Sequence, residues 1–215
     1  MGLLFITAAP ATADDPCGPS WRGQLGTVYA HWNTWDVAHY PTPIAPDSWN
    51  SNPELTTSPY ADADGAGWKG YKLGRYEVVG LTADNQLGFY MPNFDENEHK
   101  EVWIQVTYNN GTTGEHPEFT VNTGEEVRMT DPSLKYSKVW ADGWITDAWS
   151  FELWPNPEWE VIGLNFSSYG GGGGNTWVDQ VVIDTWCTTN NVPEPTTISL
   201  LGLGVLSLIR RKRRA

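Results

Sequence analysis

Val102-Trp-Ile-Gln-Val-Thr-Tyr108 is the stretch of sequence that indicates the fold most clearly. Every second residue is apolar or aromatic, so two different sets of side chains fall on opposite faces of an extended chain. One face carries Val102, Ile104, Val106 and Tyr108, and the other carries Trp103, Gln105 and Thr107. This alternation is typical of a β-strand with one face in a core. Asn110-Gly111 follows and predicts a tight hairpin, because both central turn residues must adopt positive φ.

The rest of residues 14–191 has the same period-2 character and little helical periodicity. Further strands are predicted at 75–81, 86–91, 118–121, 126–130, 149–154, 161–166 and 180–186. Residues 41–67, rich in Pro, Asn, Ser and Asp, are predicted to form one long irregular region. Eight or more short strands with frequent turn signals predict an all-β fold, namely an antiparallel β-sandwich of the jelly-roll kind.

The charge of the chain is unevenly distributed. Of its 13 Lys and Arg residues five lie at 210–214, so eight remain in the first 209 residues against 26 Asp and Glu. Such an acidic body repels phosphate backbones, so we exclude nucleic acid as a partner. Two cysteines among 215 residues also exclude a disulfide-dense scaffold and a four-cysteine zinc site.

The first 13 residues have the features of the second half of a secretory signal peptide. An apolar stretch at 3–9 is interrupted by Pro10, and Ala11-Thr12-Ala13 forms an A-x-A cleavage pattern. A positively charged region, which normally opens such a signal, does not precede the apolar stretch. We therefore expect residues 1–13 to be a partial signal peptide whose start lies upstream.

The C-terminal residues have the order of features found in a removable membrane anchor. Val192-Pro193-Glu194-Pro195 is followed by the uncharged, Leu-rich stretch 196–209. A basic cluster ends the chain, formed by Arg210, Arg211, Lys212, Arg213 and Arg214. At about 1.5 Å per residue the stretch spans about 21 Å as a helix, less than the roughly 30 Å hydrocarbon core. It suits a transient stop in the inner membrane with the basic cluster on the cytoplasmic side, which is removed afterwards.

These last 24 residues resemble the PEP-CTERM sorting signal, in which the same three features follow in this order. The resemblance implies recognition by a membrane-embedded exosortase, cleavage at or near the Pro-Glu-Pro sequence, and delivery to the cell envelope or the extracellular matrix. Pro193 and Pro195 would hold the backbone extended for a protease, and Glu194 would be the recognised side chain. The chain is thus divided into a partial signal at 1–13, a sandwich at 14–191 and a sorting signal at 192–215.

Two short motifs in the body are similar to those of uncharacterised bacterial exported domains. They are Trp21-Arg-Gly-Gln24 near its start and Pro155-Asn-Pro-Glu-Trp-Glu160 before the last predicted strands. The similarity implies a surface protein and indicates no activity.

Cys17 and Cys187 are expected to form a disulfide in an exported chain. The bond would join the first segment of the body to its last strand. In the chain-entropy model, closing so long a loop stabilises the fold by on the order of 5 kcal/mol.

The sequence contains none of the common catalytic motifs, and its histidines (His31, His39, His99 and His116) are scattered. We therefore expect a non-enzymatic protein. A glycoside hydrolase or lyase is a third possibility after the two roles named below, with carboxylates from 95–101, 115–118 or 125–126. Asp62-Ala-Asp64-Gly65 resembles the start of a calcium loop, and Asp179 is a further candidate ligand for Ca²⁺.

Thirteen tryptophans are too many for all of them to lie in the core. Exposed indole rings offer flat surfaces on which sugars stack. The candidates for such stacking are Trp103, Trp140, Trp144, Trp154 and Trp159. The leading expectation is an exported structural or adhesive protein of the envelope or matrix. The second is a glycan-binding module with extracellular polysaccharide as its partner.

Overall fold

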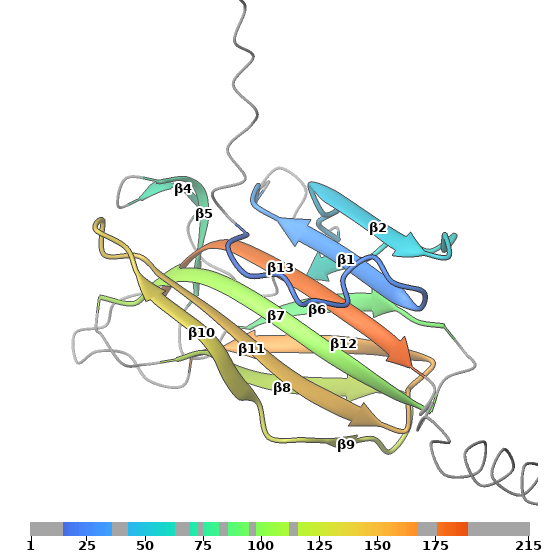
Figure 1. Cartoon of the computed structure of the whole chain (residues 1–215). Coiled ribbons are helices and arrows are strands. Elements are labelled where there is room, and N and C mark those ends of the chain that lie inside the picture. Colours follow the sequence, from blue (N-terminus) through green and yellow to red (C-terminus); the bar gives the residue numbers. More distant parts are fainter. Residues whose placement is uncertain are drawn as a thin grey trace, which may run out of the picture.

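The computed structural model describes residues 15–35, 43–62, 69–72, 75–81, 86–94, 98–111, 116–166 and 176–188. Within these ranges the chain forms thirteen β-strands and no helix, and the strands make two antiparallel sheets (Figure 1). The predicted all-β antiparallel sandwich is therefore confirmed. The predicted signal at 1–13, the short C-terminal helix and the sorting signal at 192–215 lie outside the described residues.

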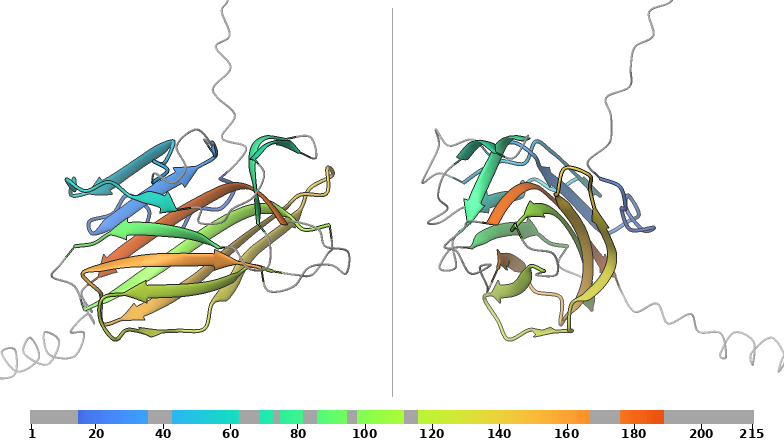
Figure 2. Two further views of the ribbon diagram at one scale, coloured as in Figure 1. Left: turned by 180° about the vertical axis from the view of Figure 1, so that it is seen from behind. Right: turned by 90° about the vertical axis from the view of Figure 1, so that its left-hand side faces the viewer.

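The strands in chain order are β1 (Thr27–Trp32), β2 (Ser48–Asn52), β3 (Tyr60–Asp62), β4 (Lys69–Lys72), β5 (Arg75–Leu81), β6 (Leu87–Pro92), β7 (His99–Asn109), β8 (Glu118–Thr123), β9 (Arg128–Met129), β10 (Ser133–Val139), β11 (Ile145–Trp154), β12 (Trp159–Asn165) and β13 (Thr176–Thr188). The large sheet has the order β10-β11-β7-β13-β1-β2, with β5 paired to β13, β4 to β5 and β9 to β11. The small sheet has the order β3-β6-β12-β8. Figure 2 shows the small sheet lying across one face of the large sheet. We call that face of the large sheet its inner face and the opposite one its outer face.

The stretch 102–108 lies in β7, which pairs with both β11 and β13 near the centre of the large sheet. Its predicted apolar face is the inner face, where four side chains have no exposed surface: Val102, Ile104, Val106 and Tyr108. These residues belong to one hydrophobic core with Phe89 of β6 and Ile162 of β12. Full burial of one such side chain contributes roughly 1.5–3 kcal/mol, so the alternation in β7 both defines the strand and holds the sheets together.

The other predicted strands are all present, and β5 has the predicted bounds. The predicted strand 126–130 is reduced to the two residues of β9. The prediction of one irregular region at 41–67 was wrong in part, because β2 and β3 lie within it. β2 has the polar sequence Ser-Trp-Asn-Ser-Asn, and it is a strand because each of its residues pairs with a residue of β1.

The hairpin predicted at Asn110-Gly111 was also wrong. Gly111 does have a positive φ of 70°, and its N–H donates to Asn109 Oδ1 at 3.0 Å. The next strand, β8, lies in the small sheet, whereas β7 pairs with β11 and β13. The dipeptide thus fixes the local backbone conformation and does not determine which strand pairs with β7.

Gly26 connects the start of β1 with the ends of two neighbouring strands. Its N–H donates to Asn52 O at 2.6 Å, and its carbonyl accepts from Cys187 N at 2.9 Å. Its φ is 86°, and a Cβ placed on it would lie 2.4 Å from Cys187 O. Only glycine satisfies both the backbone conformation and this close approach.

Candidate functional site

An ion-pair cluster fastens the start of the body to the outer face of the large sheet. Arg22 Nε and Nη2 donate to the two carboxylate oxygens of Asp184, at 2.6 and 2.5 Å. Arg22 Nη1 also pairs with Asp15. The guanidinium carbon lies 4.7 Å from the centre of the Tyr29 ring on β1. The Asp184 side chain is only 1% exposed, so its negative charge is buried, and the positive charge of Arg22 neutralises it.

The first body motif, Trp21-Arg-Gly-Gln24, supplies this cluster. The Trp21 ring is buried and stacks on Trp186 with their centres 5.7 Å apart. Trp21 and Arg22 therefore both bind β13 from the outer side. The structure gives this motif a role in docking the N-terminal segment onto the sheet.

The titration of Asp184 leads to a prediction. Burial raises the pKa of Asp184 from 3.8 to about 6, and its hydrogen bonds to Arg22 lower it only in part, while Asp15 raises it. Burial also acts to lower the pKa of Arg22, but its bonds to the two acids raise it overall, so the pair is charged at pH 7. Since the folded state holds the Asp184 proton more tightly than the unfolded chain, the contribution of this group to stability should increase as the pH falls from about 6 to about 4.

At about 1.4 kcal/mol per pKa unit this gain approaches about 3 kcal/mol. Urea unfolding of the wild type and of Asp184→Asn at pH 7 and pH 4 measures it. On acidification, the wild type should gain stability relative to the variant. Equal changes in the two proteins would contradict the prediction.

The predicted sugar-stacking tryptophans are all at least half-buried. Trp144 is fully buried, and the guanidinium of Arg75 lies 4.7 Å from its ring centre, so the expectation of an exposed ring is corrected for this residue. One face of Trp154 is covered by the ring of His99, which is parallel to it at 4.3 Å. Lys138 Nζ lies 3.4 Å from the centre of the Trp140 ring. These rings are used in contacts within the chain.

The other two candidates are also half-buried. Trp159 packs against Gly124, where a Cβ would lie 3.2 Å from its ring. Trp103 lies on the outer face of β7, paired with Asp184 of β13 on one side and with Ser150 of β11 on the other. Among the five candidate tryptophans, Trp103 is the one that lies on the outer face between two polar residues, Ser150 and Asp184.

A second charged cluster lies between the sheets, and the sequence analysis missed it. Lys100 of β7 and Glu160 of β12 form an ion pair in which both side chains are 0% exposed. Lys100 Nζ donates to Glu160 Oε1 and to Asn93 Oδ1. Asn93 Nδ2 donates to Glu160 Oε2 at 2.7 Å and to Pro157 O at 2.5 Å. Burial raises the pKa of Glu160, and the charge of Lys100 and the two hydrogen bonds only partly offset this.

Cys17 and Cys187 are both free, so the predicted disulfide is not formed in this structure. Cys17 Sγ donates to Gln105 Oε1 at 3.2 Å, on the outer face of β7. Cys187 pairs in register with Lys100 on the inner side, and its Sγ lies 3.7 Å from Asn93 Oδ1. The sheet therefore separates the two sulfur atoms, whereas a disulfide needs Cα atoms within about 7 Å. Burial raises the pKa of the Cys17 thiol to about 11 and also raises that of Cys187.

The two predicted calcium ligands that the structure describes, Asp62 and Asp179, lie in different sheets. Asp62 is exposed on β3 of the small sheet, and Asp64 lies outside the described residues. Asp179, on β13 of the large sheet, has its carboxylate paired with Arg75. Across the described ranges, no group of three or more His, Cys, Asp or Glu side chains is placed to hold a metal ion. Calcium binding stays a prediction.

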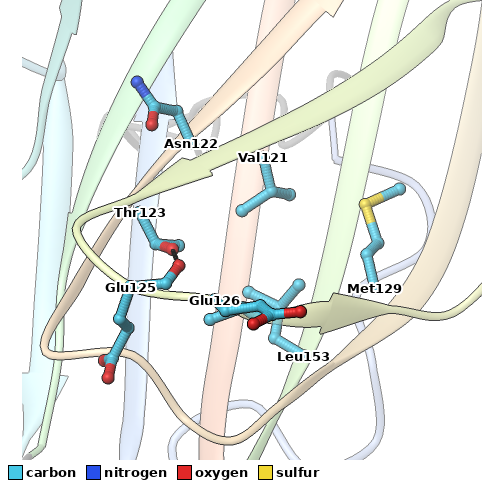
Figure 3. Close-up of a pocket in the computed structure, with 8 residues that line it drawn as sticks. Val121, Asn122, Thr123, Glu125, Glu126, Met129 and Leu153 are labelled. Carbon is cyan, nitrogen blue, oxygen red and sulfur yellow. Dashed lines mark hydrogen bonds between the residues drawn. The ribbon is translucent and has the colours of Figure 1, made fainter.

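A surface hollow of about 320 Å³ contains one pair of the carboxylates considered for a hydrolase. It is lined by Val121, Asn122, Thr123, Glu125, Glu126, Val127, Met129 and Leu153. Figure 3 shows the Glu125 and Glu126 carboxylates directed to different sides of the hollow. Glu125 Oε1 accepts from Glu158 N at 3.2 Å, so this carboxylate caps the chain before β12. The Glu125 carboxylate is therefore used in a hydrogen bond within the chain.

Asp147 is a buried acid that the sequence analysis also missed. Tyr108 Oη donates to Asp147 Oδ2 at 2.8 Å, and His116 Nδ1 lies 2.6 Å from the same oxygen. Burial and the neighbouring Asp147 charge raise the pKa of Tyr108. Asp147, Trp149 and Phe151 are every second residue of β11, so their side chains lie on the same face of the strand. This period-2 spacing could have placed Asp147 on the inner face.

Comparison with known protein families finds the PEP-CTERM protein-sorting motif at residues 191–214. This range contains the residues predicted for sorting, from Val192 to Arg214. The structure and this motif define an exported β-sandwich protein with a C-terminal sorting signal. The chain thus carries a PEP-CTERM sorting signal, which supports export and membrane-associated sorting by an exosortase to the cell surface. No curated protein and no solved structure matches the chain, so the resemblance of the body to exported domains stays a prediction.

No helix in the described part of the chain has the length and apolarity needed to cross a membrane. The apolar stretch 196–209 is not among those residues.

Proposed function

We propose that the sandwich at 14–191 is a non-enzymatic structural or adhesive component of the cell envelope or the extracellular matrix. One observation supports this most directly. β13 ends at Thr188, and only residues 189 and 190 separate it from the sorting motif at 191–214. Cleavage at the motif would therefore leave every described strand in place, so the released product is a complete sandwich.

The experiment uses cells that carry the exosortase. Cells in which the gene for the sandwich protein is deleted should adhere or aggregate less than the parent cells. The wild-type gene of the sandwich protein should restore the parental level. Glu194→Ala should not restore it, and its product should remain full-length in the inner membrane. Glu158→Ala, an exposed acid before β12, is the matched control and should behave as the wild type. Unchanged adhesion without the protein would contradict the structural or adhesive role, and a shortened surface product from Glu194→Ala would contradict the role of the motif.

Glycan binding at the outer face is a second proposal, favoured by the position of Trp103. This half-buried indole pairs with Ser150 of β11, which is also half-buried and offers a hydroxyl group beside an aromatic ring. Retention of the mature protein on polysaccharide from the same cells tests it. Trp103→Ala should weaken retention by on the order of tenfold, whereas Val139→Ala, at a position that is 58% exposed on β10, should not. Equal retention of both variants would contradict this proposal.

A further inference from the structure

The cluster of Lys100, Glu160 and Asn93 needs an explanation other than stability. Both charged side chains have no exposed surface. Taking two charges out of water costs several kcal/mol for each ion, and apolar residues of similar volume often stabilise a fold equally well. The cluster nevertheless places an amine, a carboxamide and a carboxyl group in mutual hydrogen-bonding contact.

The geometry assigns each group a chemical role. Lys100 Nζ contacts Asn93 Oδ1, so a nucleophilic nitrogen lies beside the side-chain carbonyl of an amide. The Glu160 carboxylate bridges the two reactants, with Oε1 bonded to Lys100 Nζ and Oε2 bonded to Asn93 Nδ2 at 2.7 Å. One oxygen of Glu160 thus faces the attacking nitrogen, and the other faces the nitrogen that would leave.

We propose that Lys100 and Asn93 form an intramolecular isopeptide bond, with Glu160 transferring the protons. The Lys100 ammonium gives a proton to Glu160, and the neutral amine attacks Asn93 Cγ. The bond between Cγ and Nδ2 then breaks, while the second proton lost from Nζ passes through Glu160 to Nδ2, which leaves as ammonia. A new amide joins Nζ to Cγ, no atom is oxidised or reduced, and Glu160 remains as the neutral acid.

The surroundings of the three groups favour this reaction. Pro157 O accepts a hydrogen bond from Asn93 Nδ2 at 2.5 Å, which fixes the amide with its oxygen toward Lys100. Cys187 Sγ, 3.7 Å from Asn93 Oδ1, is a weak donor on the side where negative charge develops during attack. Burial raises the pKa of Glu160, which favours the protonated acid that the reaction leaves behind. The product replaces a buried ion pair by neutral groups.

The bond would connect the two sheets covalently. Asn93 follows β6 of the small sheet directly, whereas Lys100 lies in β7 of the large sheet. This inference concerns the body of the protein and does not depend on the proposed function or on what the sandwich binds.

Peptide mapping of the purified full chain tests the proposal. Trypsin cuts after Arg75, Lys100 and Arg128, and Asn93 and Lys100 both lie between the first and last of these sites. Because an acylated lysine is not cut, the wild type should give one peptide spanning 76–128 that is lighter than its sequence by one ammonia. A peptide that ends at Lys100, or a 76–128 peptide of unchanged mass, would overturn the proposal. Asn93 could also lose ammonia by cyclising onto its own backbone. In that case the Lys100 amine stays free, trypsin cuts after Lys100, and the resulting peptide ending at Lys100 would likewise overturn the proposal.

Three variants test the roles of the groups. Asn93→Asp should give a 76–128 peptide of the same mass as that of the wild type, because it loses water in place of ammonia. Glu160→Gln keeps the shape of the side chain but cannot accept the proton, so its digest should contain the peptide that ends at Lys100. Asn156→Asp is the matched control, since the Asn156 amide donates to Phe94 O at 2.9 Å, and it should remain cross-linked. Cross-linking in Glu160→Gln would overturn the role of Glu160, and the wild-type digest decides on the bond itself even if a variant does not fold.

Discussion

Relative to the wild-type chain in which Lys100 is still a free amine, replacing Lys100 with Met should lower the free energy of unfolding at pH 7 by about 3–5 kcal/mol, because the substitution leaves the Glu160 carboxylate without its counter-ion in the core. Glu160 has no exposed surface, so water cannot take over the role of the ammonium group. Asn93 Nδ2 still donates to Glu160 Oε2, but one neutral donor does not balance a full charge. Chemical denaturation at pH 7 measures the loss.

The double variant Lys100→Met with Glu160→Gln is the matched control. Both variants lack the amine, so the comparison between them isolates the carboxylate charge independently of any covalent bond at Lys100. The double variant should be more stable than the single one at pH 7 by about 3 kcal/mol. Since the folded state raises the pKa of Glu160, protonation favours folding, and the difference should shrink as the pH falls. Equal stability of the two variants at pH 7 would contradict the unpaired-charge explanation.

Gly26→Ala should destabilise the sandwich by at least about 3 kcal/mol. A non-glycine residue at a φ of 86° costs of order 1–3 kcal/mol by itself. The new Cβ would also lie 2.4 Å from Cys187 O, so β13 or β1 would have to move. That movement would weaken two backbone hydrogen bonds, each contributing about 1 kcal/mol, from Gly26 N to Asn52 O and from Cys187 N to Gly26 O.

Gly23→Ala separates these two effects. Gly23 has a similar φ of 81°, but a Cβ there would meet no atom within 4 Å. Its substitution should therefore cost only the conformational part, about 1–2 kcal/mol. Thermal and urea unfolding of the two variants measure the difference. A loss at Gly23 as large as that at Gly26 would show that the contact with Cys187 O has no effect.

The strands that could be predicted from the sequence are those whose alternation coincides with the burial that the structure shows. β7 has apolar residues at every second position from 102 to 108, and these four side chains are fully buried. β5 was predicted with its bounds, and its Val79 and Leu81 lie in the core. In these strands the hydrophobic effect and the strand period make the same demand, so local reasoning was sufficient.

Two of the strands that were not predicted, β10 and β2, depend on their partners. β10 has only one half-buried residue, Tyr136, and its other side chains are exposed. It is a strand because its backbone pairs with β11 from Ser133 to Val139. β2 is similarly polar and pairs with β1. Such edge strands are stabilised by hydrogen bonds to a strand distant in sequence, and their own residues give no clear pattern.

The internal cluster could not be predicted for the same reason. Lys100 and Glu160 are separated by 60 residues, and they lie in different sheets. Their meeting depends on how the two sheets pack, which the alternation in each strand does not specify.

The predictions for the tryptophans relied too much on the local sequence. A turn beside Trp144 suggested exposure, but this residue is fully buried and the Arg75 guanidinium lies over its ring.

The long ladder between β7 and β13 determines how the sandwich would respond to tension. The ladder extends to Thr188, where β13 ends just before the sorting motif. The hydrogen bonds between antiparallel strands are perpendicular to the strand direction. A pull on the C-terminal end along β13 would therefore load all of these bonds together, in shear, and would not peel them apart one at a time. If the body is held to a surface by this end, the longest ladder among its described strands lies in line with the applied force.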